Sequence, residues 1–252
     1  MNTQHLTIEP SEVSWKTMAL DGGGEVQLQM YLKGADGGPE AVRARISEGY
    51  EVEPHFHLAA QFQLLLEGSM EFPIFRLDAP AVHYTEHNVP YGPFKVSDGH
   101  DMLVLHTKPG GVVMMRDKER RRQANTRGRE ITCCAHEVDW ESFPGCEGAR
   151  RKVLIPPSEG PSVEILECPP GMQFAAGAPA YGRYEVVLTG SASADGKQFG
   201  PKGLRFVEAD EQASALTCGP QGAVLIILTF DHDAAQSYGG STEEVLAGME
   251  RV

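Results

Sequence analysis

Hydrophobic positions along this chain come in short runs, and long stretches with helical spacing are few. The runs are apolar or alternate between apolar and polar residues, and Gly, Pro, Asp and Asn separate them: QLQMYL, AVRARI, QFQLLLEG, DMLVLH, YEVVLTG and AVLIILTF. Alternation with a period of two is typical of β-strands, and many short strands between turn residues are typical of sandwiches and barrels. Only the terminal stretch STEEVLAGMERV predicts a helix, with Ser241 or Thr242 as its cap. The pattern therefore predicts an all-β fold.

The same pattern of runs occurs twice in the chain. The tetrapeptide EVSW near the start returns as EVDW, the run QFQLLLEG at 61–68 is matched by RYEVVLTG at 183–190, and LVLHT at 103–107 is matched by LIILT at 225–229. Several matches in the same order indicate two copies of one β-module, each of about a hundred residues.

Between the copies lies a basic segment, RDKERRRQANTRGREI at 116–131, with seven Lys and Arg residues. Such a segment could contact nucleic acid, but it has no interleaved aromatic residues and it stands in an acidic protein. We therefore expect a solvated linker that pairs with acidic surface of a neighbouring module or subunit. This divides the chain into a first module at 1–115, the linker, and a second module at 132–252 that ends in the short helix.

The first module contains two histidines one residue apart, in GYEVEPHFHLAAQFQLLLEGSM at 49–70. Because side chains on a strand alternate between faces, His55 and His57 point to the same side. Two neutral imidazoles that converge on one point indicate a metal site; the alternative is a pair of exposed histidines at a strand edge. Six of the nine histidines lie between residues 55 and 106, and exposed histidines have no reason to collect in one module. This favours a site that only the first module carries.

The second module lacks the corresponding residues. When the two copies are aligned, Gly177, Pro179 and Arg183 stand where the first copy has the two histidines and Gln61. We therefore expect any metal in the first module alone.

At these residues the sequence resembles the cupin superfamily. The first cupin motif runs Gly, five residues, His-x-His, three or four residues, Glu, six residues, Gly, and this chain meets every spacing with Gln in place of Glu, at Gly49, His55, His57, Gln61 and Gly68. The resemblance covers most of residues 10–115 and, in degenerate form, 135–230. It implies a bicupin of two tandem jelly-roll barrels (double-stranded β-helices), with the metal and the substrate inside the first. Within the superfamily, LLEGSMEF and HYTEHNVPYGPF look most like the anti-sigma-factor-type cupins.

The second cupin motif is where the chain departs from the family. In the family the second motif is Pro-x-Gly-x-x-His, and its histidine is the fourth metal ligand. In this chain VPYGPFK has Lys95 at the position of that histidine, and an alternative register puts Tyr91 at that position. A lysine would need its pKa lowered by several units to bind a cation, whereas a tyrosine could bind as phenolate if the metal lowers its pKa. Water, substrate or a nearby histidine (His83, His87 or His106) could also fill the position. Glu86 is the one carboxylate of this region that could act as a base, so Glu86, Tyr91 and Lys95 are the candidate catalytic residues.

The glutamine in the first motif changes the expected metal chemistry. The amide carbonyl of Gln61 still offers oxygen, so two imidazoles and one oxygen could hold a first-row metal. The site loses one negative charge, which weakens binding and leaves the metal a stronger Lewis acid. Gln63 should face the same interior, where it either binds substrate or satisfies a buried polar group. Arg43 and Arg45 share one strand face: if that face is interior they could bind a carboxylate or phosphate, and if it is exterior they are solvated charges.

Composition narrows the partners and the compartment. The chain has 22 basic and 35 acidic residues and a net charge of −13, which argues against nucleic acid and anionic membranes as partners. No run approaches the ~18 apolar residues of a membrane helix, and the polar start MNTQHLTIEP is not expected to be a signal peptide. The five cysteines are odd in number and form no C-x-x-C pair, which fits free thiols in a reducing compartment. We therefore expect a cytoplasmic protein.

Three functions remain open on the sequence alone. The first is an enzyme that uses one divalent metal ion (Zn, Mn, Fe or Ni) on a small organic molecule, anionic if the arginines or Lys95 face it, by dioxygenase, lyase or isomerase chemistry as the resemblance implies. The second is a non-catalytic sensory or regulatory module that binds a metal or a small ligand. The third is a structural protein with relic histidines. We expect the enzyme, assembled as a homo-oligomer (a dimer), because pairing shields the edges of short β-modules.

Overall fold

The computed structural model describes residues 6–21, 23–175 and 177–235. Almost all of the regular structure in these ranges is antiparallel β-sheet, so the predicted all-β fold is confirmed. The helix expected at 241–252 lies outside the described residues. Among those described, no helix has the length and apolar character needed to cross a membrane.

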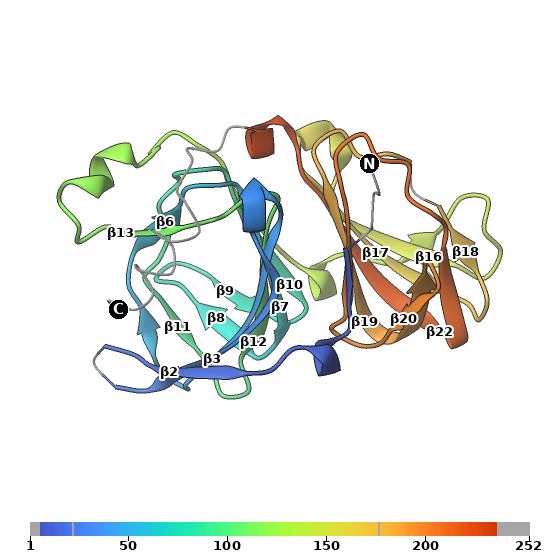
Figure 1. Cartoon of the computed structure of the whole chain (residues 1–252), viewed down its shortest axis with the longest axis horizontal. Helices are drawn as coiled ribbons and strands as arrows, with labels where there is room; N and C mark the ends of the chain where they lie inside the picture. The colour runs from blue at the N-terminus through green and yellow to red at the C-terminus, as the bar shows by residue number, and fades with distance from the viewer. Residues whose placement is uncertain (1–5, 22, 176, 236–252) are drawn as a thin grey trace. The chain divides into compact units, whose positions relative to one another are not determined.

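The described chain divides into two compact units, which we call the first and the second barrel (Figure 1). The first barrel consists of residues 14–134 together with 233–235. The second barrel consists of residues 6–13 and 135–232.

Three antiparallel sheets build the first barrel. The largest has seven strands in the order β14-β10-β7-β12-β4-β3-β2, a smaller one has four in the order β5-β11-β8-β9, and β6 pairs with β13 alone. Figure 1 shows β6 and β13 on the opposite side of this barrel from β7, β10 and β12. The strands are β2 (Lys16–Ala19), β3 (Glu25–Lys33), β4 (Glu40–Ile46), β5 (Glu51–Val52), β6 (His55–His57), β7 (Gln61–Glu67), β8 (Ser69–Glu71), β9 (Arg76–Asp78), β10 (Ala81–Thr85), β11 (Phe94–Val96), β12 (Asp101–His106), β13 (Val112–Met114) and β14 (Glu130–Cys134), with the 3-10 turns η2 (Ala35–Gly37) and η3 (Arg120–Gln123).

Strand register sorts the interior of the first barrel into an apolar end and a polar end. At the apolar end Ala81, Leu65, Met102 and Ala44 lie side by side on four adjacent strands, and all belong to one buried cluster. Side chains alternate along each strand, so the next inward positions of β7 carry the amides of the polar end. The polar residues of the first motif therefore stand on a rigid sheet above a packed core.

Gly68 shows why the first motif needs its closing glycine. Its φ of +79° lies in the left-handed region, and a Cβ there would stand 2.8 Å from Ser97 Oγ and 3.0 Å from the backbone of His100. Only glycine adopts this conformation and leaves this space without strain. The position thus fixes the turn from β7 into β8.

The second barrel is one antiparallel sheet system. Its main path runs β1-β21-β19-β22-β17-β16-β15, with β18 added to β22 and β20 added to β19. The strands are β1 (Leu6–Ile8), β15 (Glu141–Ser142), β16 (Arg150–Ile155), β17 (Ser162–Cys168), β18 (Gln173–Phe174), β19 (Arg183–Ala194), β20 (Lys197–Phe199), β21 (Leu204–Val207) and β22 (Leu216–Thr229), with the 3-10 turns η1 (Pro10–Glu12), η4 (Ala135–Glu137) and η5 (Pro157–Glu159). The 3-10 turn η6 (His232–Ala235) begins in this unit, and its last three residues belong to the first barrel.

Each barrel receives one strand from a distant part of the chain, which the sequence pattern did not indicate. Strand β1 pairs with β21 in the second barrel, and β14, which begins inside the predicted linker, pairs with β10 in the first. Both additions cover a strand that would otherwise form the edge of its sheet. The units therefore differ from the division into 1–115, 116–131 and 132–252 at both ends of the first module.

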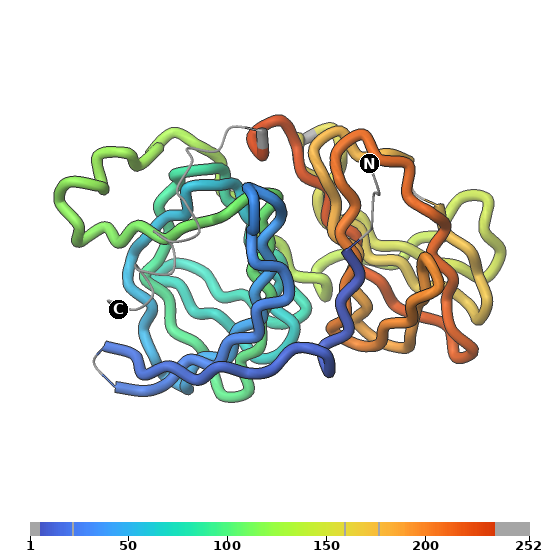
Figure 2. Tube along the Cα trace, viewed as in Figure 1, coloured from blue at the N-terminus to red at the C-terminus, as the bar shows by residue number. Residues whose placement is uncertain are grey.

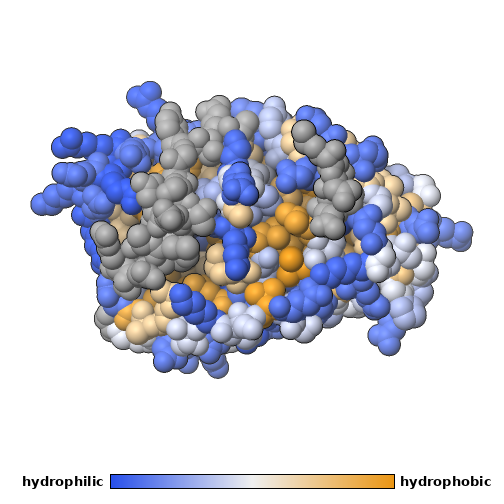
Figure 3. All heavy atoms as spheres, viewed as in Figure 1, coloured by the Kyte–Doolittle hydropathy of each residue, from blue (hydrophilic) through white to orange (hydrophobic). Residues whose placement is uncertain are grey.

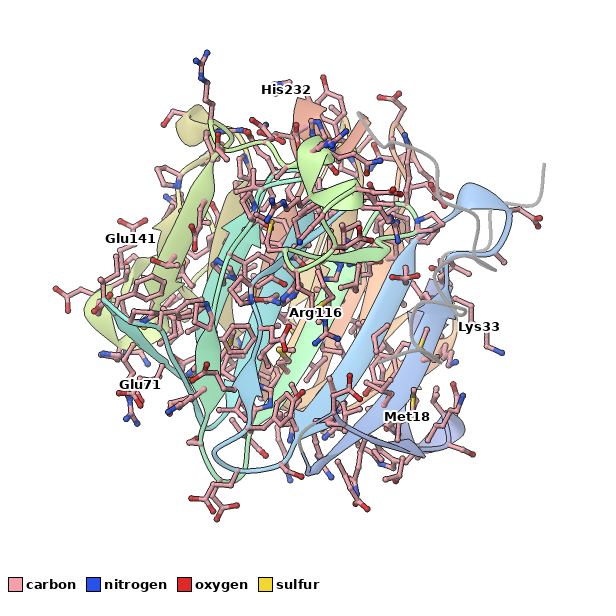
Figure 4. The ribbon with its side chains drawn as sticks, turned by 90° about the vertical axis from the view of Figure 1, so that its left-hand side faces the viewer. Met18, Lys33, Glu71, Arg116, Glu141 and His232 are labelled. Carbon is pink, nitrogen blue, oxygen red and sulfur yellow. The ribbon has the colours of Figure 1, made fainter. Side chains whose placement is uncertain are left out.

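The basic segment carries ordered contacts to the first barrel. Arg116, labelled in Figure 4, lies 2.8 Å from Glu53 and 3.5 Å from Asp21. The segment projects from the first barrel as the green tube of Figure 2, and strongly hydrophilic atoms gather at the same place in Figure 3. These ion pairs are half-exposed, so each adds little stability.

Candidate metal centre

Strand β6 turns two imidazoles toward the inside of the first barrel. Phe56, between them, packs on the other side of the strand with Leu58 and Val113, so alternation points His55 and His57 away from that cluster. Their ring centroids are 5.5 Å apart. The strand therefore presents both rings to one point, as the spacing predicts.

His55 is held in the state that binds metals. Its Nδ1 lies 2.7 Å from the carbonyl oxygen of Glu53, so Nδ1–H donates to that oxygen and the lone pair is on Nε2. Burial lowers the pKa of His55 to about 4, although the bond to Glu53 opposes this. Near neutral pH the ring is uncharged and its Nε2 is available as a ligand.

His57 is neutral for the same reason. Burial, and then the neighbouring rings of His106 and His55, lower its pKa well below the ordinary value. The ring of His106, at the end of β12, lies 5.0 Å from that of His57. Nδ1 of His106 lies 3.2 Å from the carbonyl oxygen of Ala60, and its Nε2 is 4.0 Å from Glu40 Oε1, which is too far for a hydrogen bond. His106 therefore lies beside His57 as a further candidate ligand.

Gln61 offers an oxygen to the same space. The residue is fully buried, and its Nε2 donates to Thr85 Oγ1 at 3.0 Å. Its carbonyl oxygen Oε1 has no hydrogen-bond partner among the described residues. A buried acceptor without a partner destabilises a fold by about 1–3 kcal/mol, so this oxygen has a reason to bind something else.

Tyr91 lies beside the two imidazoles. Its backbone forms an antiparallel bridge with His55, with N···O distances of 3.0 and 3.1 Å, and the two rings are 4.5 Å apart. Burial raises the pKa of Tyr91, and the side-chain amides of Gln61 and Gln63 oppose this. The residue is a neutral phenol by itself, and only a cation at the centre would favour the phenolate.

A chain of hydrogen bonds connects Tyr91 with the surface. The tyrosine hydroxyl accepts from Gln63 Nε2 at 2.8 Å, and Gln63 Oε1 lies 2.8 Å from Nδ1 of His83. The other nitrogen of His83 lies 2.9 Å from Glu130, whose side chain is 36% exposed. Gln63 thus positions Tyr91, and both nitrogens of His83 are occupied.

The remaining candidates for the second motif lie elsewhere. Phe94 and Val96 belong to the buried cluster, so the alternation of β11 turns Lys95 outward, where it is 57% exposed and 3.6 Å from Glu51. Glu86 forms an ion pair with the Arg129 side chain and accepts from its backbone N–H at 2.9 Å. Neither Lys95 nor Glu86 lies at the centre.

The third histidine named as a possible ligand is also engaged. Nδ1 of His87 lies 2.6 Å from Asp233, and the His87 backbone N–H donates to the same carboxylate at 2.7 Å. His83 and His87 are therefore engaged, and Tyr91 and His106 are the alternatives for the fourth ligand that lie beside the two imidazoles.

Arg43 and Arg45 occupy the face of β4 opposite the apolar core, because Ala44 between them belongs to that core. The Arg43 side chain is buried and its Nε donates to Asp101 Oδ1 at 2.8 Å, while Arg45 Nε donates to Oδ2 at 3.1 Å. Both guanidinium groups also lie over Trp15, at 5.0 and 4.6 Å. The two arginines form a structural ion-pair cluster with Asp101. Neither of the two alternatives from the sequence, a receptor for an anionic ligand or a pair of solvated charges, describes this arrangement.

The donor set around β6 fits a divalent first-row metal ion. Two neutral imidazoles and one unpartnered carbonyl oxygen suit Zn, Mn, Fe or Ni, and the phenol oxygen of Tyr91 could serve as a fourth donor. Sequence reasoning missed Thr85, which orients Gln61, and Glu40, which lies 4.0 Å from His106.

Comparison with models of known protein families finds no match. Comparison with curated proteins finds none either. Solved structures do match: a proposed dioxygenase from Nostoc punctiforme has a TM-score of 0.64 at 15% identity and covers 96% of this chain and 89% of its own. The oxalate decarboxylase of Lactobacillus farciminis, solved as a formate complex, has a TM-score of 0.65 at 11% identity over 92% of this chain and 87% of its own. A variant of the oxalate decarboxylase of Bacillus subtilis has a TM-score of 0.62 at 12% identity over 99% of this chain and 85% of its own. At these identities the likeness shows the fold alone, and it confirms the predicted jelly-roll barrels.

Proposed function

We propose that the first barrel is a metal-dependent enzyme site that acts on a small organic acid. The observation that carries the proposal is the convergence of His55, His57, the unpartnered oxygen of Gln61 and the phenol of Tyr91 at the polar end of a packed barrel. A pair of neutral imidazoles, of which His55 is buried and His57 is half-buried, next to an unsatisfied buried carbonyl is poorly explained by packing alone. The structural likeness to a proposed dioxygenase and to oxalate decarboxylases supports dioxygenase, lyase or isomerase chemistry on a carboxylate.

Each residue has a separate role in this proposal. His55, His57 and Gln61 would hold the ion, which would supply Lewis-acid activation of a substrate oxygen or access to oxygen chemistry. The bond from His55 to Glu53 fixes the ring and its tautomer, and Thr85 fixes the Gln61 amide.

Tyr91 would hold a proton at the centre. Its hydroxyl oxygen accepts from Gln63, so its own O–H can donate to a different group. While it keeps its proton, the hydroxyl can donate a hydrogen bond to a substrate oxygen; as the fourth ligand it would instead bind the ion as phenolate.

The test is a turnover screen of the purified protein loaded separately with Mn, Fe, Ni and Zn. Oxalate, small keto acids and phenolic acids are offered in air and under nitrogen, and consumption of substrate is followed by chromatography. We expect one metal form of the parent to turn over at least one of these acids. The double variant His55→Ala, His57→Ala should lose this turnover. The control His232→Ala, at a histidine that is 66% exposed, should retain it. Metal binding without turnover of any acid would contradict the enzyme proposal.

A second candidate is a non-catalytic module that binds metal reversibly as a sensor. The donor set favours it in one respect, because Gln61 and a neutral Tyr91 bring no negative charge and hold a cation less tightly than carboxylates would. Metal-dependent change in hydrogen exchange, together with the absence of turnover, would support it.

Assembly and location complete the proposal. We expect a homodimer, since the outer strand β2 is largely exposed and exposed strand edges favour pairing. Sedimentation at micromolar concentration would contradict this if it gave a single monomeric species. The five cysteines are all free thiols, which supports the cytoplasm as the compartment.

A further inference from the structure

The second barrel carries charged residues at the inward positions where the first barrel carries amides. Arg183 and Glu185 on β19 match Gln61 and Gln63 in the aligned runs. Val187, two residues further on, belongs to the buried cluster of the second barrel, so alternation turns Arg183 and Glu185 to the same inner face.

These residues form a buried network with more positive than negative charge. Glu185 is fully buried, and its two oxygens accept from Arg183 Nε at 3.0 Å and from Arg205 Nε at 2.7 Å. Arg205 Nη1 also donates to the carbonyl oxygen and hydroxyl of Ser214, at 3.1 and 3.2 Å. The nearest further carboxylate to Arg205 is that of Asp195, 3.9 Å away on a side chain that is 38% exposed. One buried carboxylate thus serves two buried guanidinium groups.

One nitrogen of this network is left without a partner. Arg183 Nη1 donates to the carbonyl oxygen of Gly177 at 2.6 Å, whereas its buried Nη2 has no hydrogen-bond partner within the described ranges. Burial lowers the pKa of Arg183, Glu185 opposes this, and Arg205 adds to it. A buried cationic donor without a partner is costly, and an anion would relieve that cost.

The loop residue that accepts from this guanidinium is open to solvent, whereas Nη2 itself is buried. Gly177 is exposed, and a Cβ built on it would meet no atom of the described residues within 4 Å. In the aligned first barrel this position is His55, so the second barrel has no ring here. Arg183 is therefore joined by a hydrogen bond to an exposed loop residue that carries no side chain.

We propose that the second barrel binds a small oxyanion, which accepts hydrogen bonds from Nη2 of Arg183 next to Gly177. The chemistry is a charge-assisted hydrogen bond to a carboxylate, sulfate or phosphate oxygen. One nitrogen with two N–H groups suits one oxyanion oxygen, so the ligand is small. The site lies outside the metal centre and needs no metal.

Isothermal titration of the His55→Ala, His57→Ala double variant tests this, because that background removes anion binding through a metal in the first barrel. Formate, acetate, oxalate, sulfate and phosphate are added separately at constant ionic strength, with chloride as the salt. We expect saturable binding of at least one of them, and the first three against the last two distinguish a carboxylate site from an inorganic-anion site. No saturable binding of any oxyanion would overturn the proposal.

Arg183→Gln then tests the location, because the first barrel folds with Gln at the aligned position and Glu185 keeps Arg205 as its partner. We expect affinity to fall about ten- to a hundredfold, the usual worth of a hydrogen bond to a charged group. Arg150→Gln, at an arginine of the same barrel that is 54% exposed, should leave affinity unchanged. Equal affinity in Arg183→Gln and its parent would refute the site. If Arg183→Gln does not fold, a crystal of the parent soaked in selenate decides: anomalous density beside Arg183 supports the site, and density only elsewhere overturns it.

Discussion

The substitution Gln61→Glu is the sharpest perturbation of the proposed centre. It keeps the size of the side chain and one side-chain oxygen, and it adds a negative charge at a fully buried position. In the metal-free protein that charge has no cation beside it. In the metal-bound protein it becomes a stronger ligand than the amide.

The size of the effect follows from two opposing terms. Opposite unit charges 4 Å apart attract by about 4 kcal/mol at an effective dielectric constant of 20, and removing a carboxylate from water costs several kcal/mol. We expect a net gain in metal affinity of about tenfold to a hundredfold, or ~1.4–2.8 kcal/mol. Gln61→Leu removes the donor and should weaken affinity by about tenfold to a hundredfold.

Two measurements on the same samples decide the outcome. A competitive titration against a chelator gives the metal affinity of Gln61→Glu, Gln61→Leu and the parent. Thermal unfolding with and without metal is the second measurement. A bound ligand stabilises the folded state by a free energy that grows with the logarithm of the ligand concentration divided by Kd.

The reasoning predicts a crossing of stabilities. Metal-free Gln61→Glu should unfold at a lower temperature than the metal-free parent. The rise in unfolding temperature on metal binding should be larger for Gln61→Glu than for the parent. Turnover need not improve, since added negative charge makes the metal a weaker Lewis acid. If both substitutions bind metal like the parent, Gln61 is not a ligand.

Three further predictions concern other parts of the first barrel. Burial lowers the pKa of His100 to about 4, whereas an unfolded histidine titrates near 6.5, so between these values the unfolded state holds more protons. The free energy of unfolding of the metal-free protein should therefore fall as the pH falls through that window, by up to ~3 kcal/mol from this group. His100→Phe should reduce the dependence of the unfolding free energy on pH, as measured by urea titrations. Tyr91→Phe keeps the ring contact but removes the hydroxyl, so we expect metal affinity to fall about tenfold or more. It also leaves the Gln63 amide without its partner, which should lower stability by about 1–3 kcal/mol. An unchanged metal affinity in chelator titrations would exclude the hydroxyl as a ligand. Gly68→Ala forces a Cβ against Ser97 in a left-handed conformation and should destabilise the barrel by more than about 1 kcal/mol in urea unfolding; a stability equal to the parent would show that the turn relaxes.

Local periodicity predicted the parts of the structure that depend on neighbouring residues. Alternation in QFQLLLEG puts Gln61, Gln63 and Leu65 on one face of the strand, and Leu65 belongs to the buried cluster. The rings of His55 and His57 lie 5.5 Å apart, and their role as metal ligands stays a prediction. The same logic, applied to the apolar-basic-apolar run FKV, turns Lys95 outward and would have chosen Tyr91 between the two registers.

Contacts between distant strands could not be predicted in this way. The partner of Arg43 is Asp101, which stands on another strand of the sheet 58 residues later, and no local pattern connects them. The addition of β14 to the first barrel likewise depends on which sheet edge is open, a property of the assembled fold. The bicupin assignment and the likeness to anti-sigma-factor-type cupins stay predictions.

The central claim is that one metal ion binds at β6, and metal content tests it most directly. Three proteins are purified alike: the parent, the double variant His55→Ala, His57→Ala, and the exposed control His232→Ala. Each is dialysed against excess metal and then against metal-free buffer. Mass spectrometry then gives the metal content, and circular dichroism checks the folding. We predict about one ion per chain in the parent and the control and a loss of most of it in the double variant, which stays folded because its core is the apolar end of the barrel. A folded double variant that retains the metal content of the parent would contradict the account.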